Sequence, residues 1–171
     1  MRSDSERHEM GGPKEDLIRI LQHAYSGEVA AAYAYRGHWK SLKRSPERDR
    51  IRQIEEEEWD HRRRVGGWLE KLGAAPRPAR ERVFWSIGRV LGLTCYISGW
   101  FMPMYFAGRL ESHNSVEYED AAAFAAELEM HECVRDLLDM ARVELEHEEF
   151  FRGVVSGHRL LPLMKRLFGW S

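Results

Sequence analysis

Two stretches of the sequence decide its fold: residues 54–65, Ile-Glu-Glu-Glu-Glu-Trp-Asp-His-Arg-Arg-Arg-Val, and residues 140–151, Met-Ala-Arg-Val-Glu-Leu-Glu-His-Glu-Glu-Phe-Phe. Each contains a Glu-x-x-His motif, from Glu58 to His61 and from Glu144 to His147. Residues three apart lie on one face of an α-helix. Apolar residues continue that face at three- and four-residue steps, so each motif is predicted to lie in the middle of an amphipathic helix.

Outward from these motifs, proline and glycine divide the chain into expected helices at about 14–43, 47–72, 82–98, 103–129, 132–155 and 161–168. Abundant Ala, Leu, Glu and Arg, and no sustained alternation of Val, Ile and Thr, favour helix throughout. The sequence predicts an all-α protein, a four-helix bundle with one additional apolar crossover helix. We expect three parts: a flexible N-terminal tail (1–13), the bundle (14–155), and a C-terminal tail with a short helix (156–171).

Four of the expected helices carry an apolar stripe that is interrupted by a carboxylate. The charged residues on these stripes are one per helix: Glu28, Glu58, Glu111 and Glu144. A buried, unpaired carboxylate costs several kcal/mol or becomes protonated, and converging carboxylates also repel one another. Without a cation, all four are therefore expected to have raised pKa values.

Two divalent cations would neutralise the four glutamates, and His61 and His147 would each supply one nitrogen. Ferritin-like carboxylate bundles have this ligand pattern: one Glu from each of two helices and Glu-x-x-His from each of the other two. The alternative is a bundle with protonated, buried glutamates and no metal. Glu117 is the alternative ligand if the helix at 103–129 turns a different face toward the bundle interior.

Other candidates are given a structural interpretation. Glu55, Glu56 and Glu57 project from other helical faces and are expected on a solvated surface. Tyr35 and Tyr118 are candidates for contacts with the ligands. Five other histidines are expected at the surface or beside ligands: His23, His38, His113, His131 and His158.

Three segments of the sequence resemble a known family: Gly27-Glu28-Val29-Ala30-Ala31, Tyr35-Arg36-Gly37, and Glu144-Leu145-Glu146-His147. They are similar to motifs of the demethoxyubiquinone hydroxylases, ferritin-like di-iron monooxygenases of ubiquinone biosynthesis. The resemblance covers about residues 16–151. In contrast to the family pattern, Tyr25 and Ser26 separate His23-Ala24 from Gly27, and Glu117 precedes Tyr118.

The resemblance implies a catalytic site in which two iron ions per chain activate dioxygen to hydroxylate a quinone-like or other apolar substrate. Manganese is the alternative metal, and the electron donor is unidentified. The implied iron ligands are Glu28, Glu58, His61, Glu111, Glu144 and His147. Two other functions remain open: a ferroxidase or peroxide-removing di-iron or di-manganese protein, and a helical scaffold without metal.

Composition excludes some partners. Because 26 Lys and Arg balance 28 Asp and Glu, no overall field attracts nucleic acid, and no nucleic-acid partner is expected. Cys95 and Cys133 have neither Cys-x-x-Cys nor zinc-binding spacing, which favours a reducing, cytoplasmic setting.

An uncharged segment at residues 90–108 is interrupted by Gly99 and Pro103. One interpretation is that residues 82–108 lie against the inner face of a membrane and admit a lipid-like substrate. The other is that they form the interface of a homodimer. The apolar residues expected to line a substrate channel are Trp85, Trp100, Met102, Met104 and Phe106.

Overall fold

The computed structural model describes residues 12–43 and 46–170, and over these ranges it contains helices and no strand. The helices are α1 (Pro13–Ser41), α2 (Pro46–Lys71), α3 (Pro78–Thr94), α4 (Phe101–Glu127), α5 (His131–Val155) and α6 (Leu161–Phe168). The predicted all-α fold is confirmed. The tail expected at residues 1–13 falls mostly outside the described residues, and α1 already begins at Pro13.

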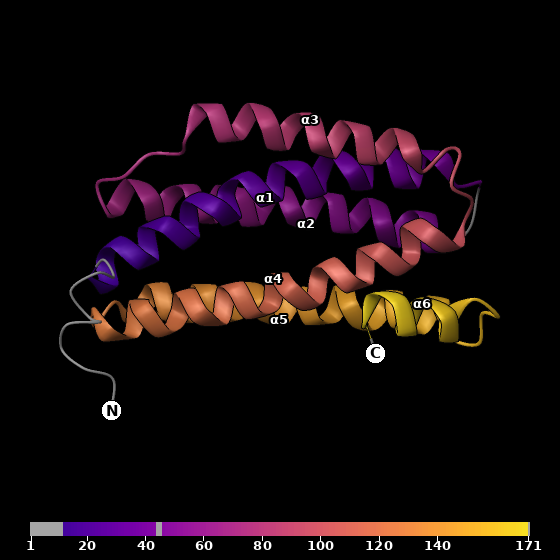
Figure 1. Cartoon of the computed structure of the whole chain (residues 1–171). Coiled ribbons are helices and arrows are strands. Elements are labelled where there is room, and N and C mark those ends of the chain that lie inside the picture. Colours follow the sequence, from indigo (N-terminus) through magenta and orange to yellow (C-terminus); the bar gives the residue numbers. More distant parts are fainter. Residues whose placement is uncertain (1–11, 44–45, 171) are drawn as a thin grey trace.

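Two antiparallel hairpins form the bundle, α1 with α2 and α4 with α5 (Figure 1). Contacts of α1 with α4 and of α2 with α5 join the hairpins. Helix α3 connects the two hairpins along the chain and packs along the outside of α1. This is the expected ferritin-like arrangement with one additional crossover helix.

The helix boundaries follow local backbone chemistry. Helices α1, α2 and α3 each begin at a proline, which lacks the N–H that a first helical turn leaves unpaired. For this reason α3 begins at Pro78, four residues before the expected start at residue 82. It ends at Thr94 rather than residue 98, and Gly99 (φ +76°) turns the chain into α4.

Two apolar clusters fill the interior of the bundle, one on either side of a polar layer. The first includes Leu21, Val65 and Leu137, and the second includes Ile54, Met104 and Phe151. Along α1, Glu28 lies between Leu21 of the first cluster and Tyr35 of the second. The acidic layer therefore lies deep within the fold, with apolar packing on both sides.

Helix α3 contacts α1 through backbone. Its buried residues are Gly88 and Gly92. A Cβ atom on Gly88 would lie 2.3 Å from the carbonyl oxygen of Ala30, and a Cβ on Gly37 would lie 2.2 Å from Cα of Gly92. Since both obstacles are backbone atoms, the close approach of the two helices depends on these glycines.

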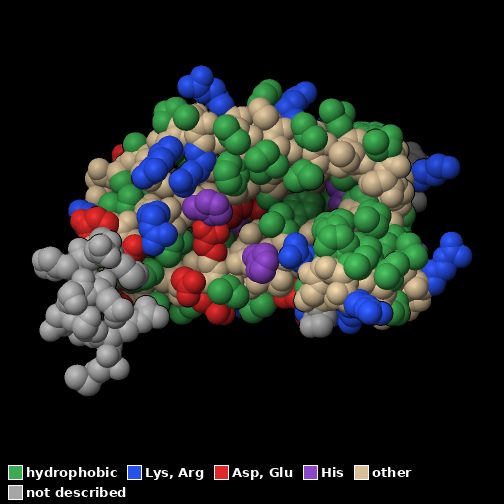
Figure 2. Space-filling model, in the orientation of Figure 1, with side chains coloured by type: hydrophobic (Ala, Val, Ile, Leu, Met, Phe, Trp, Pro, Cys, Tyr) green, Lys and Arg blue, Asp and Glu red, His purple; other side chains and the backbone are tan. Residues whose placement is uncertain are grey.

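The outer side of α3 is exposed and apolar. Val90 and Leu93 of α3 are exposed, as is Ile97 in the turn that follows it, and Figure 2 shows hydrophobic side chains over this part of the surface. Among the described residues, no helix is long and apolar enough to span a membrane.

Substitution of Gly88 tests the close backbone contact between α1 and α3. Gly88→Ala should lower the free energy of unfolding by about 1–3 kcal/mol, the usual cost of overpacking, because its new methyl group meets the backbone of α1. Urea denaturation measures this change.

The matched control is Gly67→Ala in α2, where an added Cβ has nothing within 4 Å. This variant should stabilise the protein by up to about 1 kcal/mol, because alanine favours an exposed helix interior over glycine. Equal effects at the two positions would contradict the backbone contact.

Candidate metal centre

The structure brings the six predicted ligands together in the middle of the bundle. Helix α1 supplies Glu28 and α4 supplies Glu111, while α2 and α5 each supply a Glu-x-x-His pair. None of the six is more than 3% exposed. The three-residue step places the glutamate and histidine of each pair on one helical face, so both side chains point into the bundle.

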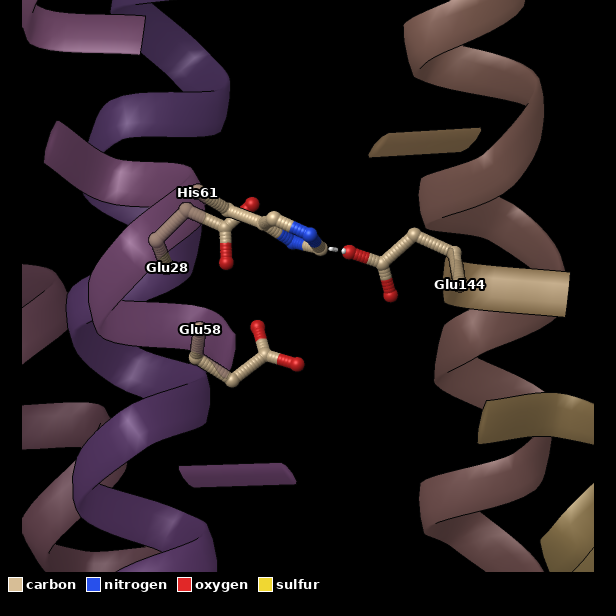
Figure 3. A group of neighbouring side chains, drawn as sticks. All are labelled: Glu28, Glu58, His61 and Glu144. Atoms are coloured by element: carbon tan, nitrogen blue, oxygen red, sulfur yellow. Dashed lines mark ion pairs between the residues drawn. The ribbon is translucent and has the colours of Figure 1, made fainter. Parts of the chain in front are cut away.

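These side chains form two overlapping groups. Within each group, one possible ligand atom from every residue lies within 4.8 Å of the others. The first group, shown in Figure 3, is Glu28, Glu58, His61 and Glu144. The second is Glu58, Glu111, Glu144 and His147. Because Glu58 and Glu144 belong to both, the arrangement offers two neighbouring cation sites that share two carboxylates.

The polar atoms of the cluster lack adequate protein partners. Nδ1 of His61 lies 2.8 Å from Oε1 of Glu144 (Figure 3), but neither atom makes a hydrogen bond of regular geometry. Both carboxylate oxygens of Glu58 and of Glu144, together with Nδ1 of His147, are also buried without hydrogen-bond partners. Such atoms carry a large desolvation cost, which bound cations would offset. Carboxylate oxygens with one imidazole per ion suit iron or manganese.

Burial and mutual repulsion shift the pKa values of the cluster. Desolvation, followed by the charge of Glu144, raises the pKa of Glu58 and Glu111 well above the usual value, and desolvation also raises that of Glu28. The expectation of four raised values is wrong for Glu144. Burial acts to raise its pKa too, but contacts with His147 and His61 outweigh it and lower the pKa.

Neighbouring hydroxyl and amide groups fix the carboxylates. Tyr35 donates a hydrogen bond to Oε1 of Glu111, and Tyr118 donates one to Oε1 of Glu28. Asn114 donates through Nδ2 to Oε2 of Glu111 at 3.1 Å. The expected contacts of Tyr35 and Tyr118 with ligands are thus confirmed, and both hydrogen bonds join α1 to α4 in opposite directions.

Glu57 orients one of the imidazoles. Its Oε2 atom lies 2.6 Å from Nε2 of His147. A proton on Nε2 therefore leaves Nδ1 of the ring free to face the cluster. Partial burial opposes ionisation of Glu57, but His147 and Arg50 together lower its pKa to about 2. The expectation of a solvated surface is therefore wrong for this residue.

Glu55 was also expected at the surface, and it is buried. Arg36 and Trp39 of α1 donate hydrogen bonds to its carboxylate, each at 2.7 Å. Glu56 does lie on the surface, as expected. The helical period correctly places Glu55 and Glu56 off the apolar stripe of α2. Helix α1, however, covers the part of the α2 surface where Glu55 lies.

The register of α4 determines which of its glutamates joins the cluster. Glu111 is fully buried there, whereas Glu117 lies outside and contacts Nδ1 of His23 at 2.8 Å. Among the other histidines, His23, His113 and His131 are exposed, as expected. His38 is buried, which excludes the surface and leaves the other expected place, beside the ligands, for this residue.

An apolar cavity of about 280 Å³ lies between α1, α3 and α4 and adjoins the cluster. Tyr35 forms part of its wall and also bonds to Glu111. Of the predicted channel residues, Met102 and Phe106 line the cavity. Trp85, Trp100 and Met104 do not, because each lies elsewhere: two are on the surface and Met104 is in the core.

A helical bundle with two overlapping groups of carboxylates and imidazoles defines the class of ferritin-like di-metal proteins. Within that class, the chain belongs to the COQ7 family. Residues 15–150, more than half of the chain, match the family described as "Ubiquinone biosynthesis protein COQ7". This is a family of di-iron hydroxylases, and the resemblance inferred from the sequence is confirmed. No curated protein and no solved structure gives a match.

The pKa shifts of the cluster predict how stability depends on pH. Three carboxyl groups and both imidazoles have raised pKa values in the folded, metal-free protein. A group with a raised folded pKa contributes stability that is complete below its unfolded pKa and is lost as pH rises through the folded pKa. The melting temperature of chelator-treated protein should therefore fall between about pH 5 and pH 8.

Over the same range, the lowered pKa of Glu144 contributes no slope, because that group is ionised both folded and unfolded. Iron binding requires deprotonated ligands, so the gap between iron-loaded and metal-free melting temperatures should widen with pH. Glu111→Gln removes one titrating group and should make the metal-free decline shallower. A gap that stays constant would mean that these groups do not repel one another.

Proposed function

We propose that the six clustered residues bind two iron ions, and that the chain uses them with dioxygen to hydroxylate a quinone-like ring. The observation that carries the proposal is the contact of Tyr35 with Glu111, because this tyrosine also forms a wall of the apolar cavity. A ring in that cavity would lie beside the ligand cluster. Membership in the COQ7 family supports a quinone-like substrate.

In this proposal, Glu58 and Glu144 serve both ions, because each belongs to both groups. Glu28 and Glu111 each serve one ion, and their hydrogen bonds with Tyr118 and Tyr35 hold them in place. Glu57 keeps His147 oriented toward the cluster. Manganese fits the same donor set and is the alternative metal.

The bound metal pair would supply dioxygen activation, and the chain would orient the substrate and exclude water. In a monooxygenase reaction, one oxygen atom replaces a ring hydrogen as a hydroxyl group and the other leaves as water. The reaction consumes two electrons and two protons, which an external electron donor would supply. A ferroxidase has no use for an apolar cavity, so the cavity favours hydroxylation.

We also propose that the apolar outer side of α3 lies against a membrane. Leu163 and Leu167 of α6 are also exposed, and Figure 2 shows hydrophobic side chains over the parts of the surface where α3 and α6 lie. An amphipathic element of this kind can lie in the membrane interface without crossing it. A lipid-like substrate would then pass directly from the membrane into the cavity. A homodimer interface is the alternative use of this surface.

The metal site predicts a stoichiometry and a specific loss. Protein reconstituted anaerobically with Fe(II) should contain about two irons per chain. Glu111→Ala should lower the iron content to about one or less. It should also reduce, at least ~10-fold, the incorporation of oxygen from isotopically labelled dioxygen into a short-chain quinone. Elemental analysis and mass spectrometry of the product measure the two effects.

Glu117→Ala is the matched control, because Glu117 lies on the same helix outside the cluster. It should retain both iron and activity. The opposite result would show that Glu117, not Glu111, is the ligand. Iron binding with oxidation of Fe(II) and no hydroxylated product would favour a ferroxidase.

Vesicle binding tests the apolar surface. Leu93 and Ile97 are 66% and 86% exposed, so replacing both with serine should not disturb the core. Wild-type protein should float with phosphatidylcholine vesicles in a density gradient, and the double variant should remain at the bottom.

The control replaces Leu138 and Leu145, two exposed leucines of α5, with serine, and this variant should still float. Sedimentation analysis without vesicles tests the alternative, a homodimer interface. A dimer that dissociates in the Leu93 and Ile97 variant, with no flotation of wild-type protein, would assign the surface to a second copy of the chain.

A further inference from the structure

The cavity contains a polar atom that the fold leaves unpaired. His38 lines the cavity from α1 and is 2% exposed, and its Nε2 has no hydrogen-bond partner. Among the described residues, two buried side-chain atoms outside the metal cluster lack a partner: Nε2 of His38 and the hydroxyl oxygen of Tyr105. Of these two, only His38 lines the cavity. A buried polar atom without a partner is costly, so its presence here calls for a ligand.

The other polar side chains of the cavity wall either have a partner or, like Ser98, are exposed to solvent. The hydroxyl of Tyr35 donates to Glu111, that of Thr94 donates to the carbonyl oxygen of Leu91 at 2.7 Å, and Sγ of Cys95 contacts the same carbonyl. The rest of the lining is largely apolar. A molecule in the cavity would thus find one buried hydrogen-bonding group without a partner on a largely apolar wall.

The position of His38 relative to the metal cluster is fixed by packing. Both Tyr35 and His38 stack on Phe151, with ring centroids 5.9 and 6.4 Å away and interplanar angles of 10° and 13°. A three-residue step along a helix is a rise of about 4.5 Å. The two rings are therefore held on one face of α1, with Tyr35 toward the cluster and His38 farther from it.

The imidazole is suited to bind an uncharged oxygen. Burial lowers the pKa of His38 to about 4, so the ring is neutral near pH 7. A neutral imidazole has one donor and one acceptor nitrogen, and it can pair with either a carbonyl or a hydroxyl group. It can therefore pair with both a quinone and its reduced, phenolic form.

We propose that Nε2 of His38 forms a hydrogen bond with a ring oxygen of the substrate, and that this bond orients the ring between His38 and the metal cluster. The proposal rests on the proposed function for the identity of the ligand, an oxygenated aromatic ring. It adds the residue that distinguishes such a ring from an apolar one. A site that pairs a hydroxyl group can discriminate strongly against an analogue without it, whereas an apolar pocket cannot.

Two matched probes test this role: 4-propylphenol and propylbenzene, which differ by one hydroxyl group and do not alkylate thiols. Binding to the iron(II)-loaded full chain is measured anaerobically by calorimetry. Wild-type protein should bind propylphenol about tenfold more tightly than propylbenzene, the effect of one buried hydrogen bond. His38→Leu should abolish that preference without weakening propylbenzene binding, and His38→Gln, which retains a hydrogen-bonding group, should restore part of it.

The matched control is Tyr105→Phe, which removes the other unpaired buried atom outside the cavity. It should keep the preference for propylphenol. The ligand-free His38→Leu variant should melt at or above the wild-type temperature, because it loses an unpaired polar atom. A preference that survives in His38→Leu, a wild-type protein without any preference, or a clear drop in melting temperature would each overturn the proposal.

These outcomes are separable from failure of the proposed function. If wild-type protein hydroxylates a quinone but His38→Leu keeps the phenol preference, only the role of His38 fails. If the preference depends on His38 but no quinone is hydroxylated, the recognition site stands and the assigned reaction fails.

Discussion

The structure depends on the electrostatic cost of placing four carboxylates in the centre of a helical bundle. Glu28, Glu58, Glu111 and Glu144 come from different helices and are essentially inaccessible to water. In the absence of cations their negative charges would oppose the close packing of the two hairpins. Bound cations would convert the same charges into the attraction that joins the hairpins. The apolar clusters on either side would then exclude water from that attraction and strengthen it.

Helical periodicity was sufficient to predict the fold and to select the six residues that converge. One carboxylate on each apolar stripe cannot be explained by solubility, so the pattern pointed to the interior of the bundle. The same reasoning distinguished Glu111 from Glu117, because only Glu111 shares a face with apolar residues such as Met104. The structure places Glu111 in the cluster and Glu117 outside it. What periodicity gives is the direction of a side chain relative to its own helix axis.

The errors have a common physical origin, since periodicity does not reveal what a neighbouring helix places against a face. Glu55 lies off the apolar stripe of α2, but Arg36 and Trp39 of α1 cover it and satisfy its charge. Glu57 was likewise assigned to solvent, although it reaches His147 across the bundle. His38 lines a cavity together with residues of α3, and the close approach of α3 depends on glycines that carry no amphipathic signal. Contacts of this kind arise from the tertiary arrangement and cannot be read from one helix alone.

The glycine contact between α1 and α3 separates two requirements that usually compete: attachment of α3 to the bundle and the choice of its exposed side chains. Gly88 and Gly92 attach α3 through backbone contact, and the remaining side chains of that helix are not buried. Substitutions on its outer side can therefore change the surface chemistry of the protein while the bundle and its acidic centre stay intact. The outward side chains of α3 could thus be exchanged without altering its contact with α1. A polar outer side would weaken the proposed contact with a membrane, and a more apolar one would strengthen it.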